Sequence, residues 1–128
     1  NMKLSCIFAY TFIETNMKTV ILENTWLSGI TSHGWGNGYV IIPEGHKLHG
    51  KHYEELNKRK AISVNGGLTY SELADARIIK QFGLSDEHLG SWIVGFDTCH
   101  CWDDMQRWPK DEVQKEADKL LSQLKSLK

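Results

Sequence analysis

The C-terminal segment carries the pattern that most restricts the fold. An apolar stripe recurs there at i, i+4, i+7, i+8 and i+11, formed by Val113, Ala117, Leu120, Leu121 and Leu124. This period is that of an α-helix with one buried face. Pro109 suits its first turn, and Asp111 and Glu112 suit the positive end of the helix dipole. Such a helix gains its stability by packing on another apolar surface.

A sheet is the partner surface that the sequence offers. Short runs of β-branched and aromatic residues predict strands over residues 4–13, 19–22, 39–42, 61–64 and 90–96. The polar break at 14–16 suggests a hairpin loop, residues 33–38 a glycine-rich loop and 65–67 a turn. Residues 51–57 predict a short helix or turn, and 71–81 a helix. We therefore expect an α+β fold, a mostly antiparallel sheet packed by the C-terminal amphipathic helix.

Composition limits the class of protein. The 128 residues suit a single domain over 1–128, with 41% hydrophobic and 24% charged residues. A formal charge of −1 lacks the basic excess typical of proteins that bind long nucleic acid. No apolar run approaches the roughly 20 residues that span a membrane. Three cysteines without repeated spacing indicate a reducing compartment. These features predict a cytoplasmic protein without membrane contact, and they leave a homo-oligomer open.

The first chemically rich loop covers residues 43–52. Its histidines, His46, His49 and His52, can bind a metal or titrate near neutral pH. Alternatively, His46 caps a turn while the other two face water. We favour this second interpretation, because neighbouring loop histidines seldom converge outside a defined motif. Lys51 adds a positive charge to the same loop.

The second loop begins at Asn65. The paired glycines Gly66 and Gly67 can bring backbone N–H groups to an anion, and the hydroxyls of Thr69 and Tyr70 can complete a phosphate cradle. The alternative is a tight turn joining two strands, which the same residues form without a ligand. No Gly-Lys-Ser/Thr follows, so the segment is not a P-loop.

The third loop follows the strand predicted at 90–96 and carries the most chemistry. Asp97, His100, Asp103 and Asp104 can bind a divalent ion, or supply a base and its orienting partner. The alternative is that these aspartates cap turns. The flanking Cys99 and Cys101 are weak evidence for zinc, because structural zinc sites favour wider spacing and a second ligand pair.

Tryptophans are numerous for so short a chain. We expect most of the five to lie in the core, namely Trp26, Trp35, Trp92, Trp102 and Trp108. Trp35 and Trp102 differ because they sit in polar or glycine-rich loops, where an indole can stack on a nucleobase or sugar.

Four motifs support a family resemblance. They are Gly38-Tyr39-Val40, Pro43-x-Gly45-His46 with Gly50-Lys51-x-Tyr53, Gly66-Gly67-Leu68-Thr69-Tyr70-Ser71, and Gly95-Phe96-Asp97-x-x-His100. Through them the chain resembles a family of small proteins common in bacteriophage and prophage genomes. Relatives often carry His in place of Asn65 and small residues in place of Cys99 and Cys101, which argues against a metal role for Asn65 and against shared cysteine chemistry. The resemblance implies a phage origin and brings no activity with it.

Three functions fit these features. The first is a phage accessory, anti-defence protein in the host cytoplasm that sequesters a small, anionic, nucleotide-derived ligand without a cofactor. Its site would comprise His46, Lys51, Asn65, Gly66, Gly67, Thr69, Tyr70, Asp97, His100 and Trp102. The second is a hydrolase of a phosphodiester or nucleotide whose divalent metal is held by Asp97, His100, Asp104 and His46. The third is an inhibitor that docks on a host defence enzyme. We rank binding first because it requires fewer converging ligands.

Overall fold

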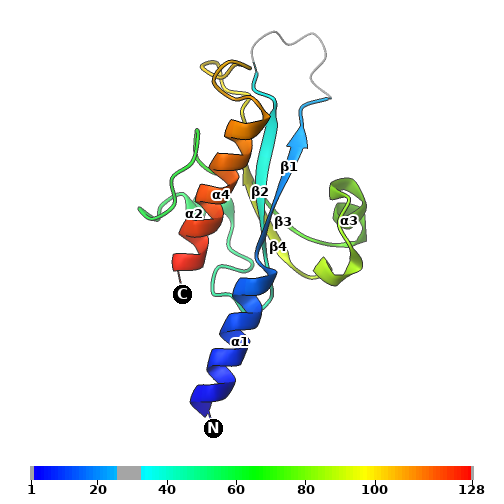
Figure 1. Ribbon diagram of the computed structural model, residues 1–128, viewed down its shortest axis with the longest axis vertical. Coiled ribbons are helices and arrows are strands. Elements are labelled where there is room, and N and C mark those ends of the chain that lie inside the picture. The colour runs from blue at the N-terminus through cyan, green and yellow to red at the C-terminus, as the bar shows by residue number, and fades with distance from the viewer. Residues whose placement is uncertain (1, 26–32, 128) are drawn as a thin grey trace.

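The computed structural model describes residues 2–25 and 33–127, and in the first helix it describes side chains from residue 7 onward. A four-stranded antiparallel sheet has the order β1-β2-β4-β3 and is combined with four α-helices and one 3-10 turn (Figure 1). The elements are α1 Met2–Asn16, β1 Lys18–Glu23, β2 Gly36–Ile42, α2 Tyr53–Leu56, β3 Tyr70–Leu73, α3 Ala76–Phe82, η1 Asp86–His88, β4 Trp92–Phe96 and α4 Lys110–Ser126. The predicted α+β class is confirmed.

Each face of the sheet packs on its own helix. The alternating residues Val40 and Val94 face α4, whose predicted stripe is buried at Val113, Ala117, Leu120 and Leu124. The opposite residues Tyr39, Ile41 and Ile93 pack on Ile78, Ile79 and Phe82 of α3. The strands predicted at 19–22, 39–42 and 90–96 correspond to β1, β2 and β4. The central strands therefore have buried residues on both faces.

The strand expected at residues 4–13 is wrong, because this segment lies in α1, which extends away from the sheet (Figure 1). An apolar run without strict alternation does not separate a strand from a helix. A segment that pairs with no strand satisfies its amides locally, as a helix does. Thr11, Thr15 and Asn16 also donate to the carbonyls four residues earlier. Residues 14–16 thus end α1 and form no hairpin loop.

Two other expectations fail in the middle of the chain. Residues 61–64 are irregular and form no strand, and the backbone of Ser63 bonds instead to a side chain of α4. The amide of Gln123 donates to the Ser63 carbonyl, and its oxygen accepts from the Ser63 N–H. The helix expected over 71–81 starts only at Ala76, where the Asp75 side chain caps it, because residues 70–73 pair with β4 as β3.

The glycine-rich stretch at 33–38 is only partly a loop, because β2 begins at Gly36. Glycine at position 38 allows a close approach between strands: a Cβ there would lie 2.5 Å from the Phe96 ring. Trp35, Trp92 and Trp108 pack partly buried against the α4-side core, whereas Trp102 is exposed and Trp26 lies outside the described residues.

Candidate functional site

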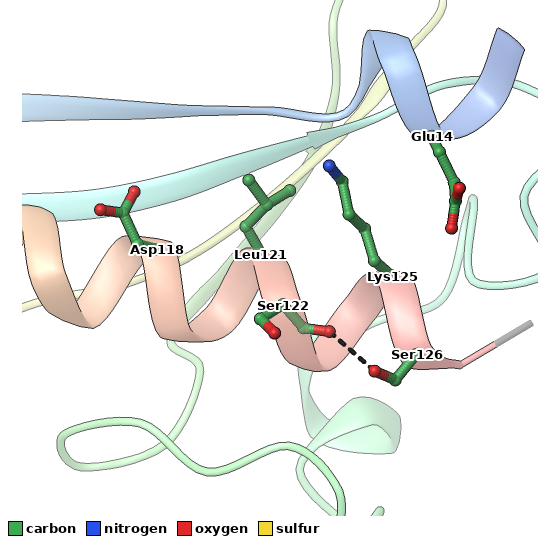
Figure 2. Close-up of a pocket in the computed structure, with 6 residues that line it drawn as sticks. All are labelled: Glu14, Asp118, Leu121, Ser122, Lys125 and Ser126. Atoms are coloured by element: carbon green, nitrogen blue, oxygen red, sulfur yellow. Dashed lines mark hydrogen bonds between the residues drawn. The ribbon is translucent and has the colours of Figure 1, made fainter. Parts of the chain in front are cut away.

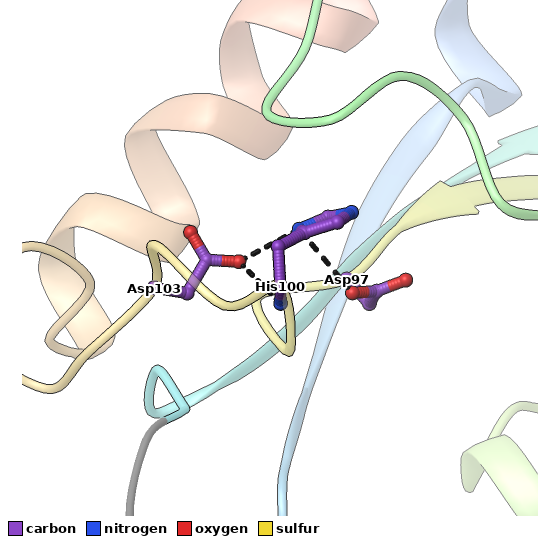
Figure 3. A group of neighbouring side chains, drawn as sticks. All are labelled: Asp97, His100 and Asp103. Atoms are coloured by element: carbon purple, nitrogen blue, oxygen red, sulfur yellow. Dashed lines mark hydrogen bonds and ion pairs between the residues drawn. The ribbon is translucent and has the colours of Figure 1, made fainter.

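The loop that follows the central strand β4 brings three ionisable side chains together. Asp97 lies directly after Phe96, and His100 and Asp103 follow in the turns beyond it. Ligand-type atoms of the three lie within 4.8 Å of one another. Figure 3 shows the imidazole flanked by the two carboxylates. Because β4 is held between two neighbours, the start of this loop has a rigid base.

A buried carboxylate fixes the His100 ring. His100 Nδ1 lies 2.7 Å from Asp103 Oδ2, and Asp97 Oδ1 lies 3.6 Å from the same nitrogen. The His100 backbone N–H also donates to Asp103 Oδ2, at 2.9 Å. The Asp103 side chain is fully buried, so the pair is largely shielded from solvent. In neutral His100, Nδ1 therefore carries the proton and Nε2 is the basic nitrogen.

Asp97 is held from two sides. Its Oδ1 accepts from the Cys99 backbone N–H at 2.9 Å, and its Oδ2 accepts from the Thr69 hydroxyl at 2.8 Å. Thr69 directly precedes the edge strand β3, and its own N–H donates to the Gly95 carbonyl. The sheet thus places the second and third loops of the sequence analysis against each other.

Asn65 connects the site to α4. Its side-chain Nδ2 donates to Asp103 Oδ1 at 2.9 Å, and its Oδ1 accepts from the Trp102 indole N–H at 3.2 Å. Its backbone N–H donates to the Glu116 carboxylate at 2.9 Å. Asn65 therefore orders the buried acid and the exposed indole from one position.

Trp102 and Gly66 both contact the His100 ring. The Trp102 and His100 rings are stacked, with centroids 4.6 Å apart and planes 6° apart, while 51% of Trp102 stays exposed. Gly66 has φ +71°, and a Cβ there would lie 2.3 Å from His100 Cε1 and Nε2. A side chain at position 66 would therefore displace the ring. We call His100 and Trp102 the stacked platform.

Residues 64–67 form a turn, although it does not join two strands, because residues 61–64 form none. The Gly67 N–H donates to the Val64 carbonyl at 2.9 Å, and φ at Gly66 is positive, as at the third position of a type II turn. The Leu68 N–H donates to the Asn57 side chain at 2.7 Å. These backbone donors are used within the fold, so the cradle predicted around Gly67 has fewer amides to offer an anion.

The structure places the remaining predicted residues elsewhere. His46 is buried, accepts from the Leu48 N–H at 3.1 Å and lies against the Leu124 carbonyl near the end of α4. Burial lowers the pKa of His46, the nearby Lys47 adds to this, and the Leu124 carbonyl opposes it. The Lys51 ammonium pairs with Glu55 at 3.6 Å, and the Lys51 carbonyl accepts from Trp92, at the end of β4 away from Asp97.

Tyr70 and Asp104 also point away from the stacked platform. Tyr70 packs edge-on against Tyr39 on the α3 face, and burial first, then nearby Glu72, raises the pKa of its phenol to about 12. Asp104 accepts from the Arg107 N–H at 2.8 Å and stabilises the next turn. Asp103 lies three residues after His100, and its N–H donates to the His100 carbonyl to close a turn. The carboxylate beside His100 is therefore that of Asp103 and not that of Asp104, which the metal hypothesis named.

Sequence reasoning missed Glu116 and Arg107. Glu116 lies on α4, 51 residues from Asn65, and no local pattern indicates its contact. Arg107 donates to the Trp102 backbone carbonyl at 3.3 Å, which places a cation beside that residue's backbone. The sequence indicates this contact only through the position of Arg107, five residues after Trp102 in a turn-rich loop.

The cysteine next to the site is poorly suited to be a nucleophile. Burial raises the pKa of the Cys99 thiol, and the nearby carboxylates of Asp97 and Asp103 raise it further. Its Sγ lies 3.6 Å from Asn24 Nδ2. The thiol therefore stays protonated at neutral pH.

Two cavities lie outside this loop. One of about 450 Å³ opens between the end of α1 and α4 (Figure 2). Its lining is Glu14, Asp118, Leu121, Ser122, Lys125 and Ser126. A second, of about 440 Å³, lies on the α3 side of the sheet.

Comparisons of the chain with protein-family models, with curated proteins and with solved structures find no match. Within residues 2–25 and 33–127, no helix has the length and apolar character needed to cross a membrane.

Proposed function

We propose that the protein binds a small nucleotide-derived ligand at the stacked platform, with the base against Trp102. The observation that carries this proposal is the half-exposed indole, held flat against a histidine that a buried aspartate fixes. Aromatic faces that are ordered before a ligand arrives bind bases with little loss of side-chain entropy. Stacking of a base on such a face contributes about 1–3 kcal/mol.

Neighbouring groups suit the other parts of such a ligand. Asp97 keeps 29% of its side chain accessible and can accept from an exocyclic amine of the base. The Arg107 guanidinium, bonded to the Trp102 carbonyl, supplies a cation for a phosphate. Lys51, which the sequence analysis included in the site, pairs with Glu55 instead.

The occupied carboxylates favour binding over metal-dependent hydrolysis. Both oxygens of Asp97 and both of Asp103 already accept hydrogen bonds. An ion held by all three residues through His100 Nδ1 would have to displace the Nδ1 proton and its bond to Asp103. The hydrolase remains the second candidate, because the three ligand-type atoms do lie within 4.8 Å.

The biological role that we propose is the one that the phage resemblance suggests. Holding a host signalling nucleotide would lower its free concentration and so counter host defence. Docking on a host enzyme is the third candidate, because Trp102 and Met105 are 51% and 52% exposed in the same loop.

Isothermal titration with mononucleotides and with cyclic mono- and dinucleotides tests the proposal. We expect saturable one-site binding without added metal, weakened about tenfold or more by Trp102→Ala and largely kept by Trp102→Phe. Ribose 5-phosphate, which lacks a base, should bind far more weakly. Arg107→Ala should weaken the binding of nucleotides but not that of the corresponding nucleosides.

A parallel titration with Zn²⁺, Mn²⁺ and Mg²⁺ separates the candidates. Stoichiometric metal binding that is lost in His100→Ala, without nucleotide binding in metal-free protein, would replace our proposal with the hydrolase. Neither nucleotide nor metal binding would move the protein inhibitor to first place.

A further inference from the structure

A second pocket lies on the opposite side of the sheet from α4. Asn37 of β2 pairs with Leu22 of β1, and both side chains face the α3 layer. The cavity at this point has a volume of about 440 Å³. Its lining is Leu22, Glu23, Thr25, Asn37, Tyr39 and Gln81. None of these residues belongs to the stacked platform.

The floor of this pocket contains an unpartnered acceptor. Asn37 is 7% exposed, and its Oδ1 has no hydrogen-bond partner among the described residues. A buried polar atom without a partner destabilises the fold, and such atoms are rare in folded proteins. An acceptor that lines a cavity can recover this cost when a ligand donates to it.

The rest of the lining selects the kind of donor. The Tyr39 phenol lines the cavity beside Asn37, and Glu23, an exposed residue at the end of β1, adds a negative charge near its edge. Burial raises the pKa of Tyr39, with further contributions from the charges of Asp97 and Cys99, against an opposing hydrogen bond from Asn37. The lining thus holds one carboxylate, several neutral oxygens and no basic side chain. This combination favours a cation.

We propose that this pocket binds a small primary ammonium compound with a short apolar stem. The ammonium group would donate to Asn37 Oδ1, with the Glu23 carboxylate at the rim and the stem against Leu22. This site is additional to the nucleotide site and does not depend on it.

Butylammonium chloride is the probe, with 1-butanol and sodium chloride as controls for shape and ionic strength. We expect butylammonium to shift the amide resonances of β1 and β2 saturably in ¹H–¹⁵N spectra, and both controls to leave them almost unchanged. Equal shifts with butanol would overturn the proposal, because the pocket would then recognise only the apolar stem.

Variants assign the binding to particular atoms. Asn37→Leu should weaken butylammonium binding about tenfold or more, and Asn37→Asp should strengthen this binding several-fold. Glu23→Gln, at an exposed position, should weaken it about threefold and decides the question if Asn37→Leu fails to fold. His100→Ala should change nothing. Unchanged affinity in Glu23→Gln and Asn37→Leu would refute the site, whatever the outcome at Trp102.

Discussion

Two loops of this chain contain both histidine and acidic residues, yet they are built differently. In the loop of residues 43–52, each ring bonds to a backbone group. His46 and His52 accept from the N–H groups of Leu48 and Glu54, and His49 Nε2 lies 2.7 Å from the Gly90 carbonyl. In the loop of residues 97–104, the ring of His100 bonds instead to the buried side chain of Asp103.

The difference shows which histidines are available for function. A ring that bonds to the backbone completes the local fold, and displacing it costs stability. A ring that bonds to a buried carboxylate is oriented while its second nitrogen stays basic. The number of histidines favours the first loop as a functional site, whereas the hydrogen-bond partners of the rings favour the second.

The largest effect should come from removing the buried acid. Asp103→Ala leaves the His100 N–H, His100 Nδ1 and Asn65 Nδ2 without their acceptor. We expect a loss of about 3 kcal/mol or more in the free energy of unfolding, measured by urea denaturation. Asp104→Ala, which removes one turn hydrogen bond to Arg107, should cost about 1 kcal/mol. Equal losses would show that the buried network does not hold the loop.

Two glycines, Gly50 in the loop of residues 43–52 and Gly66 in the turn against the loop of residues 97–104, give a matched pair of intermediate effect. Gly50 and Gly66 have φ +84° and +71°, but a Cβ at Gly50 meets nothing within 4 Å, whereas one at Gly66 meets the His100 ring. Gly50→Ala should cost about 1–2 kcal/mol from backbone strain alone. Gly66→Ala should cost roughly 1–3 kcal/mol more and should quench or shift Trp102 fluorescence. Identical costs and unchanged fluorescence would mean that the ring moves freely.

The smallest effect concerns the pH dependence of the first loop. Because the pKa of His46 is lowered in the folded state, the unfolded chain takes up its proton first as the pH falls. The stability linked to this group is complete above its unfolded pKa of about 6.5 and is lost as the pH falls toward the folded value. Urea denaturation from pH 7.5 to 5 should show a steeper loss for the wild type than for His46→Asn. Parallel curves would contradict this assignment.

Local sequence patterns predicted the parts of the fold whose conformation depends on residues near in sequence. The period in α4 gave its buried face, and the short strands β1, β2 and β4 lie where β-branched runs occur. The segment 4–13 failed because its composition suits a strand, while its backbone bonds only within itself as α1. Residues 61–64 failed because their partner, Gln123, is 60 residues away.

The candidate site was predictable to a similar degree. Asp97, His100 and Trp102 stood out because a strand is followed by a polar loop with an unusual indole. Choosing Asp103 over Asp104 requires the turn geometry that buries Asp103 fully and Asp104 only in part. The role of Asn65 requires its contact with Glu116, which no local spacing encodes.

The sheet order has a consequence for how the site assembles during folding. Ile42 of β2 pairs with Trp92 of β4, and Thr69 reaches Asp97 only after β3 has joined the far side of β4. Contacts between distant segments form slowly, because a long loop must close before they contribute. The proposed site around Asp97 and His100 should therefore appear late in refolding, together with the central strands. A ligand that binds there would raise the melting temperature of the whole domain and not only order one loop.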